Sequence, residues 1–367
     1  MGLKAGIVGM PNVGKSTLFN AITLSNVEAA NYPFATIEPN SGIVEVMDHR
    51  VDDMAALFNP KKVIRATLEF VDIAGLVKGA SNGEGLGNKF LANIRETDAI
   101  CQVVRCFNNN EILHVEGSVD ALRDVEIINL ELVFADLEVV DKRIEKIAKK
   151  ATTTKYKDAM FEYETLLKLK EVLQEGKNAR VLSLNDKEQE LVKSFNLLTL
   201  KPIIYVANLN ESEVSNPTCN NEYNKLVEYA KNENSLVIPI SAQIEADLAS
   251  LDAEEKLAFL NELGIEESGL DKLTKAMYSL LGLETYFTAG SDEVRAWTFK
   301  KGMKAPECAG IIHSDFQRGF IKAEIYSYED IMEYKSELKV KENGKLRIEG
   351  KEYVVKDGDV IFFKFNV

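Results

Sequence analysis

The chain has 367 residues, of which 46% are hydrophobic and 28% charged, as in a globular protein with two or three domains. No apolar stretch approaches the ~20 residues that span a bilayer, and the short apolar run at the N-terminus leads straight into a glycine-rich motif, so we expect neither a membrane span nor a signal peptide. The formal net charge of −14 argues against indiscriminate nucleic-acid binding, although it allows a local basic face.

A phosphate-binding motif stands near the N-terminus. Residues 3–8 predict a strand and residues 17–23 a helix, and between them residues 9–17 fit the template G-x-x-x-x-G-K-[ST]. In such a turn the backbone N–H groups face the α- and β-phosphates, Lys15 reaches the β- and γ-phosphates, and the Ser16 hydroxyl holds Mg²⁺. The predicted nucleotide-binding residues here are Asn12, Val13, Gly14, Lys15, Ser16 and Thr17.

Two further motifs follow in the order that a GTPase-like domain requires. Thr36 lies in a loop between the first helix and the second predicted strand, where a threonine can ligate Mg²⁺ and sense the γ-phosphate. Asp72-Ile-Ala-Gly75 comes directly after an apolar run. We expect Asp72 to bind Mg²⁺ through water and the Gly75 N–H to meet the γ-phosphate. The metal ligands predicted from the sequence are therefore Ser16, Thr36 and Asp72.

The first 120 residues predict an α/β domain with a mostly parallel sheet, since short apolar runs alternate with loops and helical segments. Its strands are expected at residues 3–8, 43–46, 67–72 and 99–107. The four cysteines, Cys101, Cys106, Cys219 and Cys308, have no metal-ligand spacing, and the first two fall in a strand that should be buried. This usage favours reduced thiols and a cytoplasmic protein.

Residues 121–201 predict an antiparallel helical arm inserted into the sheet domain. A second amphipathic stretch at 159–174 and a shorter helix at 186–195 follow the first helix of the arm. The 3-4-3-4-3 spacing of that first helix is typical of a coiled-coil seam. Its apolar positions are Leu130, Val133, Leu137, Val140, Ile144 and Ile147.

The sheet domain resumes after the arm, so we expect it to span residues 1–120 and 202–282. Strands are predicted at 202–207 and 236–240, and helices between 253 and 281. Residues 283–367 predict a small α+β domain. Its strand-like segments are 294–299, 310–313, 319–326 and 351 to the C-terminus, with a helix at 328–338 and a hairpin turn at Lys356-Asp-Gly-Asp359.

The base-reading motif of GTPases, N-K-x-D, does not occur in the sequence. Asn208-Leu-Asn-Glu211 stands in its place after the strand at 203–207, and losing the Lys while lengthening the acid should disturb guanine recognition. Ser241-Ala242, after the next strand, matches the short loop that closes over the base.

Taken together, these motifs resemble those of the YchF family of Obg-like ATPases. The similarity rests on G-M-P-N-V-G-K-S-T, N-Y-P-F-A-T-I-E-P, D-I-A-G-L-V-K-G-A-S and N-L-N-E, and on C-terminal stretches such as T-Y-F-T-A-G and V-R-A-W-T. The resemblance covers nearly the whole chain. It implies a translation-associated P-loop NTPase that prefers ATP to GTP, binds ribosomes and ends in a TGS-like (β-grasp-like) domain. It also implies that Asn208, Leu209 and Glu211 line an adenine pocket.

Two residues bear on hydrolysis. Leu76 stands where Ras-type enzymes place the glutamine that orients the attacking water. His114, in the loop after the 99–107 strand, is the best internal substitute and our candidate catalytic residue, and YchF-like proteins use a histidine at the matching position. A solvated loop histidine is the alternative. Asn12 has two interpretations, a K⁺ ligand whose ion replaces an arginine finger or a simple turn cap.

Two basic clusters suggest partners. Residues 142–157 carry seven Lys or Arg against one acid, and residues 295–322 carry six against two, with Trp297, Phe299, Phe316 and Phe320 interleaved. Such surfaces could bind RNA, with the aromatic rings stacked on bases; solvated helix faces and core packing are the alternatives. We expect a monomeric, ribosome-associated ATPase with low intrinsic turnover. The rival hypotheses are an Obg-type GTPase of ribosome assembly and a non-catalytic, nucleotide-gated adaptor.

Overall fold

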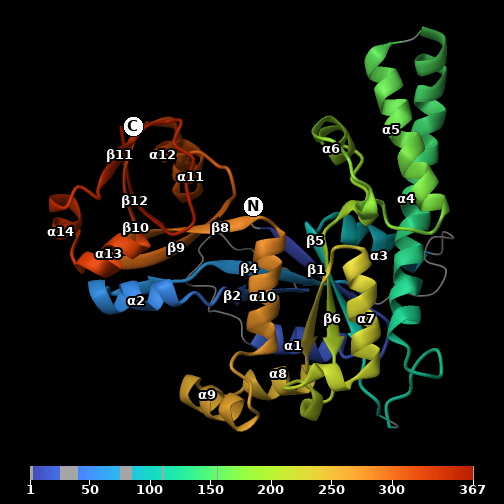
Figure 1. The fold of residues 1–367 in the computed structure, drawn as a ribbon, viewed down its shortest axis with the longest axis horizontal. Coiled ribbons are helices and arrows are strands. Elements are labelled where there is room, and N and C mark those ends of the chain that lie inside the picture. Colours follow the sequence, from blue (N-terminus) through green and yellow to red (C-terminus); the bar gives the residue numbers. More distant parts are fainter. Residues whose placement is uncertain (1–2, 25–39, 75–84, 110, 155, 367) are drawn as a thin grey trace. The chain divides into compact units, whose positions relative to one another are not determined.

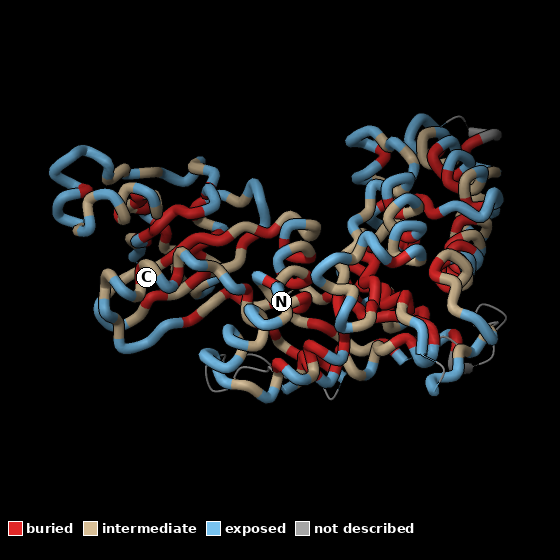
Figure 2. Tube along the Cα trace, turned by 60° about the horizontal axis from the view of Figure 1, so that its bottom comes forward, coloured by how far each residue is buried: buried red, intermediate tan, exposed pale blue. Residues whose placement is uncertain are grey.

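The computed structural model describes residues 3–24, 40–74, 85–109, 111–154 and 156–366. These residues form two compact units. The first contains residues within 3–24, 40–42 and 69–273, and the second contains residues 43–68 and 274–366. In each unit the buried positions form continuous runs, while exposed positions cover the outer loops and helix faces (Figure 2). Among the described residues, none of the helices combines the length and apolarity that crossing a bilayer requires.

A six-stranded, mostly parallel sheet with strand order β2-β4-β1-β5-β6-β7 organises the first unit (Figure 1). β1 pairs in parallel with β4 and β5, β5 with β6, and β6 with β7. Every residue of β5 and β6 is buried, as expected for central strands covered on both faces. The strands are β1 (Lys4–Gly9), β2 (Ser41–Glu45), β4 (Thr67–Asp72), β5 (Ala99–Arg105), β6 (Ile203–Asn208) and β7 (Leu236–Ile240). The helices are α1 (Lys15–Leu24), α3 (Gly85–Arg95), α7 (Asn221–Asn232), α8 (Ala242–Leu248), α9 (Ala253–Glu262) and α10 (Gly269–Leu280). The last residues of β2 and α10 and the first two of β4 are counted with the second unit.

The register of this sheet brings the predicted motifs to one edge. Gly9, the last residue of β1, lies beside Val103 of β5, and Arg105 at the end of β5 lies beside Asn208 at the end of β6. Asn208 in turn pairs with Ile240, the last residue of β7. Because parallel strands end on the same side, the loops that follow them meet there, which is where open α/β sheets bind ligands.

The helical arm follows β5 in the chain. Figure 1 shows α4 (Ala121–Thr154) and α5 (Lys157–Gln174) side by side, running away from the sheet. The chain returns through η3 (Ala179–Val181), α6 (Asp186–Lys193) and η4 (Leu198–Leu200). The predicted seam residues Val133, Leu137, Val140, Ile144 and Ile147 pack in one cluster with Leu166, Leu169 and Leu173 of α5. Leu130 is 40% exposed, so it does not extend the seam.

A buried carboxylate ties the returning segment to the arm. Asp136 of α4 is fully buried and accepts hydrogen bonds from the Leu198 N–H (2.9 Å), the Thr199 N–H (2.7 Å) and the Thr199 hydroxyl (2.6 Å). Burial raises the pKa of this carboxyl, although the three donors oppose the shift.

A mixed sheet with strand order β11-β10-β12-β8-β9-β3 organises the second unit. Its strands are β3 (Lys62–Ile64), β8 (Leu283–Ala289), β9 (Glu293–Lys300), β10 (Phe320–Ser327), β11 (Arg347–Glu349) and β12 (Asp359–Phe365). Its helices are α2 (His49–Phe58), α11 (Ala305–Ile312), α12 (Ser314–Arg318), α13 (Tyr328–Tyr334) and α14 (Glu337–Glu342). β3 pairs in parallel with β9, and Arg50 of α2 binds Asp357 at 2.7 Å. Residues 43–68 therefore pack in this unit, which the sequence did not indicate.

Two predictions for the C-terminal region are wrong. Residues 310–313, expected as a strand, form the end of α11 and its C-cap. Pro306 lies at the start of this helix, and the Glu307 carboxylate accepts the Lys304 N–H at 2.7 Å. These helix-start signals outweigh the strand preference of Ile311 and Ile312. The turn at 356–359 leads into β12 but closes no hairpin, because β12 pairs with β10 and β8.

Candidate nucleotide site

The phosphate loop joins β1 to α1 through a left-handed backbone. Asn12 has φ 64° and Gly14 has φ 93°, and a Cβ at Gly14 would lie 2.2 Å from Asn208 Nδ2. Only glycine fits there, because any side chain would displace the amide that holds the loop. Val13 is fully buried, Ser16 is exposed, and the first N–H groups of α1 have no intrahelical acceptor. This arrangement favours an anion.

The lysine of the motif lies against the acid of the next one. Lys15 Nζ contacts Asp72 Oδ1, and Asp72 is the last residue of β4. The Ser16 hydroxyl and the Asp72 carboxylate are oxygen ligands of the kind Mg²⁺ prefers, and Mg²⁺ usually completes its shell with water and substrate phosphates. The described residues therefore fit part of a magnesium site. Thr36 and Gly75, predicted for the same site, lie outside the described residues.

Asn208 connects the phosphate loop to the loop that follows β7. Its Nδ2 donates to the Val13 carbonyl at 2.8 Å, and its Oδ1 accepts the Ala242 N–H at 3.0 Å. Asn208 is 5% exposed, so its amide positions two loops by main-chain contacts. Ser241 accepts the Ile244 N–H and caps α8.

The other two residues predicted for the base pocket differ in exposure. Leu209 is 2% exposed, and its N–H donates to the Ile240 carbonyl at 2.8 Å. Glu211 is exposed in a short 3-10 turn, η5 (Glu211–Glu213). Of the three predicted adenine-lining side chains, Glu211 is thus the one open to a ligand.

His114 is buried against the arm. Its side chain is 3% exposed, so the alternative of a solvated loop histidine is wrong. Nδ1 accepts the Glu116 N–H at 3.1 Å, which leaves the ring proton on Nε2, and Nε2 lies 2.8 Å from Asp124 Oδ2 of α4. Burial raises the pKa of the Asp124 carboxyl, whereas His114 and Arg123 oppose that shift.

Arg105 organises the loop that carries His114, a role that sequence analysis missed. Its guanidinium donates to the carbonyls of Phe107 (3.2 Å), Asn109 (3.1 Å) and Ile112 (3.0 Å). Arg105 is 1% exposed, and an arginine inside the apolar run 99–107 was the available signal. Asn12 Nδ2 donates to the Leu113 carbonyl at 3.1 Å, so the phosphate loop directly contacts the residue before His114.

Comparison with known proteins identifies the family. The chain is 61% identical to "Ribosome-binding ATPase YchF" of Bacillus subtilis and 52% identical to that of Escherichia coli O157:H7, in each case over the full length of both chains. The chain belongs to the YchF family. Two family models match parts of it: "50S ribosome-binding GTPase" over residues 4–153, and the C-terminal domain of YchF GTPases, described as a protein of unknown function, over residues 283–366.

A solved YchF structure supports the same fold. The Schizosaccharomyces pombe YchF GTPase is 42% identical and superposes with a TM-score of 0.90, covering 99% of this chain and 97% of that one. The predicted YchF resemblance and the α/β P-loop fold with its helical arm and C-terminal domain are therefore confirmed.

Aromatic residues proposed to stack on RNA divide into two groups in this YchF protein. Phe299 and Phe320 are 2% and 5% exposed in the core of the second unit, so the stacking hypothesis is wrong for these two. Trp297 is partly buried, with the Arg295 guanidinium 3.8 Å from its ring centroid. Phe316 stacks on Phe365 at 3.7 Å.

Proposed function

We propose that this protein is a Mg²⁺-dependent ATPase that binds ribosomes and is gated by its nucleotide, with low turnover until a partner acts. The observation that carries the proposal is the cradle formed by the phosphate loop, in which Asn208 holds Val13 and Lys15 lies on Asp72. Backbone N–H groups and the Lys15 ammonium would neutralise the triphosphate. Mg²⁺ would supply charge stabilisation at the β- and γ-phosphates, held by Ser16, Thr36 and Asp72, while the Gly75 N–H would meet the γ-phosphate.

ATP preference follows from the altered base motif. Asn208 and Leu209 are buried. Glu211 stands at the sequence position of the missing guanine-reading aspartate, and its longer side chain disfavours guanine. Ser241 and Ala242 would close over the base from the start of α8. The two bacterial relatives named above are called ATPases, which supports this choice, whereas the solved Schizosaccharomyces pombe relative is called a GTPase.

Parallel calorimetric titrations with ATP and GTP, each with Mg²⁺ in excess, test this proposal. We expect tighter binding of ATP by the wild type and loss of binding in Gly14→Ala, whose new Cβ would collide with Asn208. Gly302→Ala is the matched control, since Gly302 also has a positive φ but nothing within 4 Å. Tighter GTP binding would favour the Obg-type GTPase, and no binding of either nucleotide would refute the nucleotide site.

His114 is our candidate for positioning the attacking water, because it lies in the loop that the phosphate loop contacts through Asn12. In this structure both ring nitrogens have protein partners, Nε2 with Asp124 and Nδ1 with the Glu116 N–H, so His114 must release one of them before it can orient a water. Single-turnover hydrolysis with and without ribosomes separates an ATPase from a non-catalytic adaptor. An adaptor would hydrolyse ATP in neither condition.

Asn12 could serve K⁺ as well as the Leu113 carbonyl, since its amide carries an oxygen in addition to the donating nitrogen. A bound K⁺ would place a positive charge at the phosphates, where an arginine finger acts in other enzymes. Equal turnover in KCl and NaCl at fixed ionic strength would refute this part of the proposal.

The bacterial relatives are named ribosome-binding proteins, and we extend that property to this chain through the basic arm and the C-terminal domain. We propose three parts: a P-loop domain of residues 1–120 and 202–282, an arm of residues 121–201, and a TGS-like domain of residues 283–367. The pairing of β3 with β9 supports adding residues 43–68 to the last part. We further propose a cytoplasmic monomer.

A further inference from the structure

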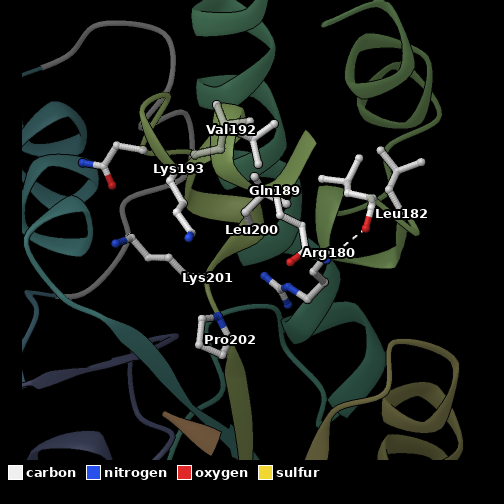
Figure 3. A pocket seen from close by; sticks show the side chains of 11 residues that line it. Arg180, Leu182, Gln189, Val192, Lys193, Leu200, Lys201 and Pro202 are labelled. Carbon is white, nitrogen blue, oxygen red and sulfur yellow. Dashed lines mark hydrogen bonds between the residues drawn. The ribbon is translucent and has the colours of Figure 1, made fainter. Parts of the chain in front are cut away.

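A cavity in the first unit lies where the arm returns to the sheet, and none of the predicted nucleotide-binding residues lines it. It has a volume of about 430 Å³ and is lined by η3, α6 and the residues that lead into β6 (Figure 3). This size falls in the range of small-molecule sites.

One wall of the cavity is apolar and belongs to the folded core. Val192 and Leu197 are 5% and 3% exposed and pack in the same cluster as the α4–α5 seam. Because these residues are fixed by the arm core, the wall exists before any ligand arrives. Its apolar members are Leu182, Leu184, Val192, Leu197 and Leu200.

The charged side chains that line the cavity are all basic. They are Arg180, Lys193 and Lys201, and the lining contains no carboxylate. This is unlike the chain as a whole, whose net charge is −14. Figure 3 shows the side chains of Arg180 and Lys193 extending into the same space. Lys201 instead donates to the carbonyls of Arg95 and Thr97, and burial lowers its pKa.

Arg180 has an unused donor. Its Nε donates to the Thr199 carbonyl at 3.2 Å and its Nη1 lies 3.3 Å from Glu233, but within the described chain its buried Nη2 has no acceptor. A buried polar group without a partner costs free energy that a bound acceptor would recover. Lys193 is exposed, and its contact with the equally exposed Glu190 is too weak to prevent it from binding a ligand.

Two other cavities among the described residues are lined by charges of both signs. In the cavity of about 630 Å³ beside α7, three glutamates face one basic residue, Lys177. In the cavity of about 490 Å³ in the second unit, three acidic residues accompany Arg50 and Lys275. The cavity at η3 and α6 differs from both, because its charged lining residues are basic without an acidic counterpart.

We propose that this cavity binds an aliphatic carboxylate. The hydrocarbon part would cover the leucine wall, and the carboxylate would meet Lys193 and the free side of the Arg180 guanidinium, whose planar geometry matches that group. The carboxylate can belong to a free aliphatic acid or to the C-terminus of a peptide that ends in leucine. Both present the same chemistry to the cavity.

The test uses the full-length protein with saturating Mg²⁺–ATP and follows the fluorescence of anilinonaphthalene sulfonate, an anion with an apolar body, as octanoate displaces it. We expect Lys193→Glu to weaken octanoate binding at least about tenfold, because a charge-assisted contact is replaced by repulsion. Gln189→Trp should also weaken octanoate binding, because the larger side chain fills the cavity without changing its charge. Lys187→Glu, on the same helix but outside the lining, should bind octanoate like the wild type.

Peptides distinguish the two sources of the carboxylate. If octanoate displaces the dye but a Gly-Gly-Leu peptide with a free C-terminus does not, the ligand of the cavity is a free aliphatic acid. If both displace it, the cavity also accepts peptide C-termini. Equal competition by the amidated peptide would overturn the proposal, since the carboxylate would then play no part. Equal octanoate affinity in the wild type and in Lys193→Glu and Gln189→Trp would overturn it as well, as would no displacement by octanoate.

Discussion

At the scale of single residues, His114 tests the proposed chemistry. Replacing it with alanine should lower kcat by about 10²–10⁴-fold, the usual contribution of a positioned proton-transfer group, while ATP affinity stays near the wild-type value. Steady-state hydrolysis and calorimetry measure the two effects separately. His313→Ala is the control, because His313 lies in the second unit and its side chain is 59% exposed. Unchanged turnover in His114→Ala would remove this residue from the mechanism.

Glu245 makes a second prediction at this scale. The residue is 4% exposed on α8, accepts the Gly269 N–H at the start of α10 (2.8 Å), and has a pKa raised by burial to about 7. Between its usual value of 4.5 and about 7, the folded state binds more protons than the unfolded state. Its contribution to the free energy of unfolding therefore falls as the pH rises through this window, by up to about 3 kcal/mol, and is constant above it.

Glu245→Gln removes that titration and keeps an oxygen for the Gly269 N–H. We expect urea unfolding of this variant to lose the stability difference that the wild type shows between about pH 5 and about pH 8. Glu254→Gln, at an exposed position of α9, should keep the wild-type pH dependence. The same pH dependence in Glu245→Gln as in the wild type would contradict the prediction.

At the scale of elements, Glu233 connects the arm to the sheet domain. Its carboxylate, at the end of α7, accepts Tyr205 of β6 (2.9 Å), Tyr229 (3.1 Å) and Asn178 (2.8 Å), besides lying near Arg180. The Arg180 and Glu233 side chains are 8% and 9% exposed. Removing one partner of such a pair leaves a buried charge without compensation.

We therefore expect Glu233→Ala to lower the free energy of unfolding by about 3–5 kcal/mol, measured by urea denaturation. Glu228→Ala, on the same helix and 74% exposed, should change it by no more than about 1 kcal/mol. If Glu233→Ala lowers the free energy of unfolding by less than about 1 kcal/mol, the prediction is wrong, and water then replaces Glu233 as the partner of Arg180.

At the scale of the whole molecule, ribosome binding should depend on salt. The exposed lysines of the arm would neutralise RNA phosphates and release counterions, so reversing Lys146 and Lys149 to glutamate should flatten the plot of log affinity against log salt by about one unit per lost contact. Sedimentation with ribosomes at several KCl concentrations measures the slope. Lys231→Glu, exposed on α7, is the control. Binding that is insensitive to salt would exclude this role for the arm.

The sequence by itself determined the motifs and most of the elements. The phosphate loop, the strand ending at Asp72, the arm helices and the strand at 236–240 follow from local patterns, because turn chemistry and the period of apolar residues act over a few neighbours. The family resemblance follows from the same motifs and is confirmed by full-length relatives.

Only the tertiary structure decided which distant residues meet. Nothing local to Asn208 indicates that it bridges Val13 and Ala242, and nothing local to His114 indicates its burial against Asp124. Likewise, residues 62–64 form a strand because β9 offers a free edge, and residues 310–313 are helical because the chain before them starts a helix. Hydrogen bonds across tens to hundreds of residues depend on how the elements pack, and local patterns carry no information about that packing.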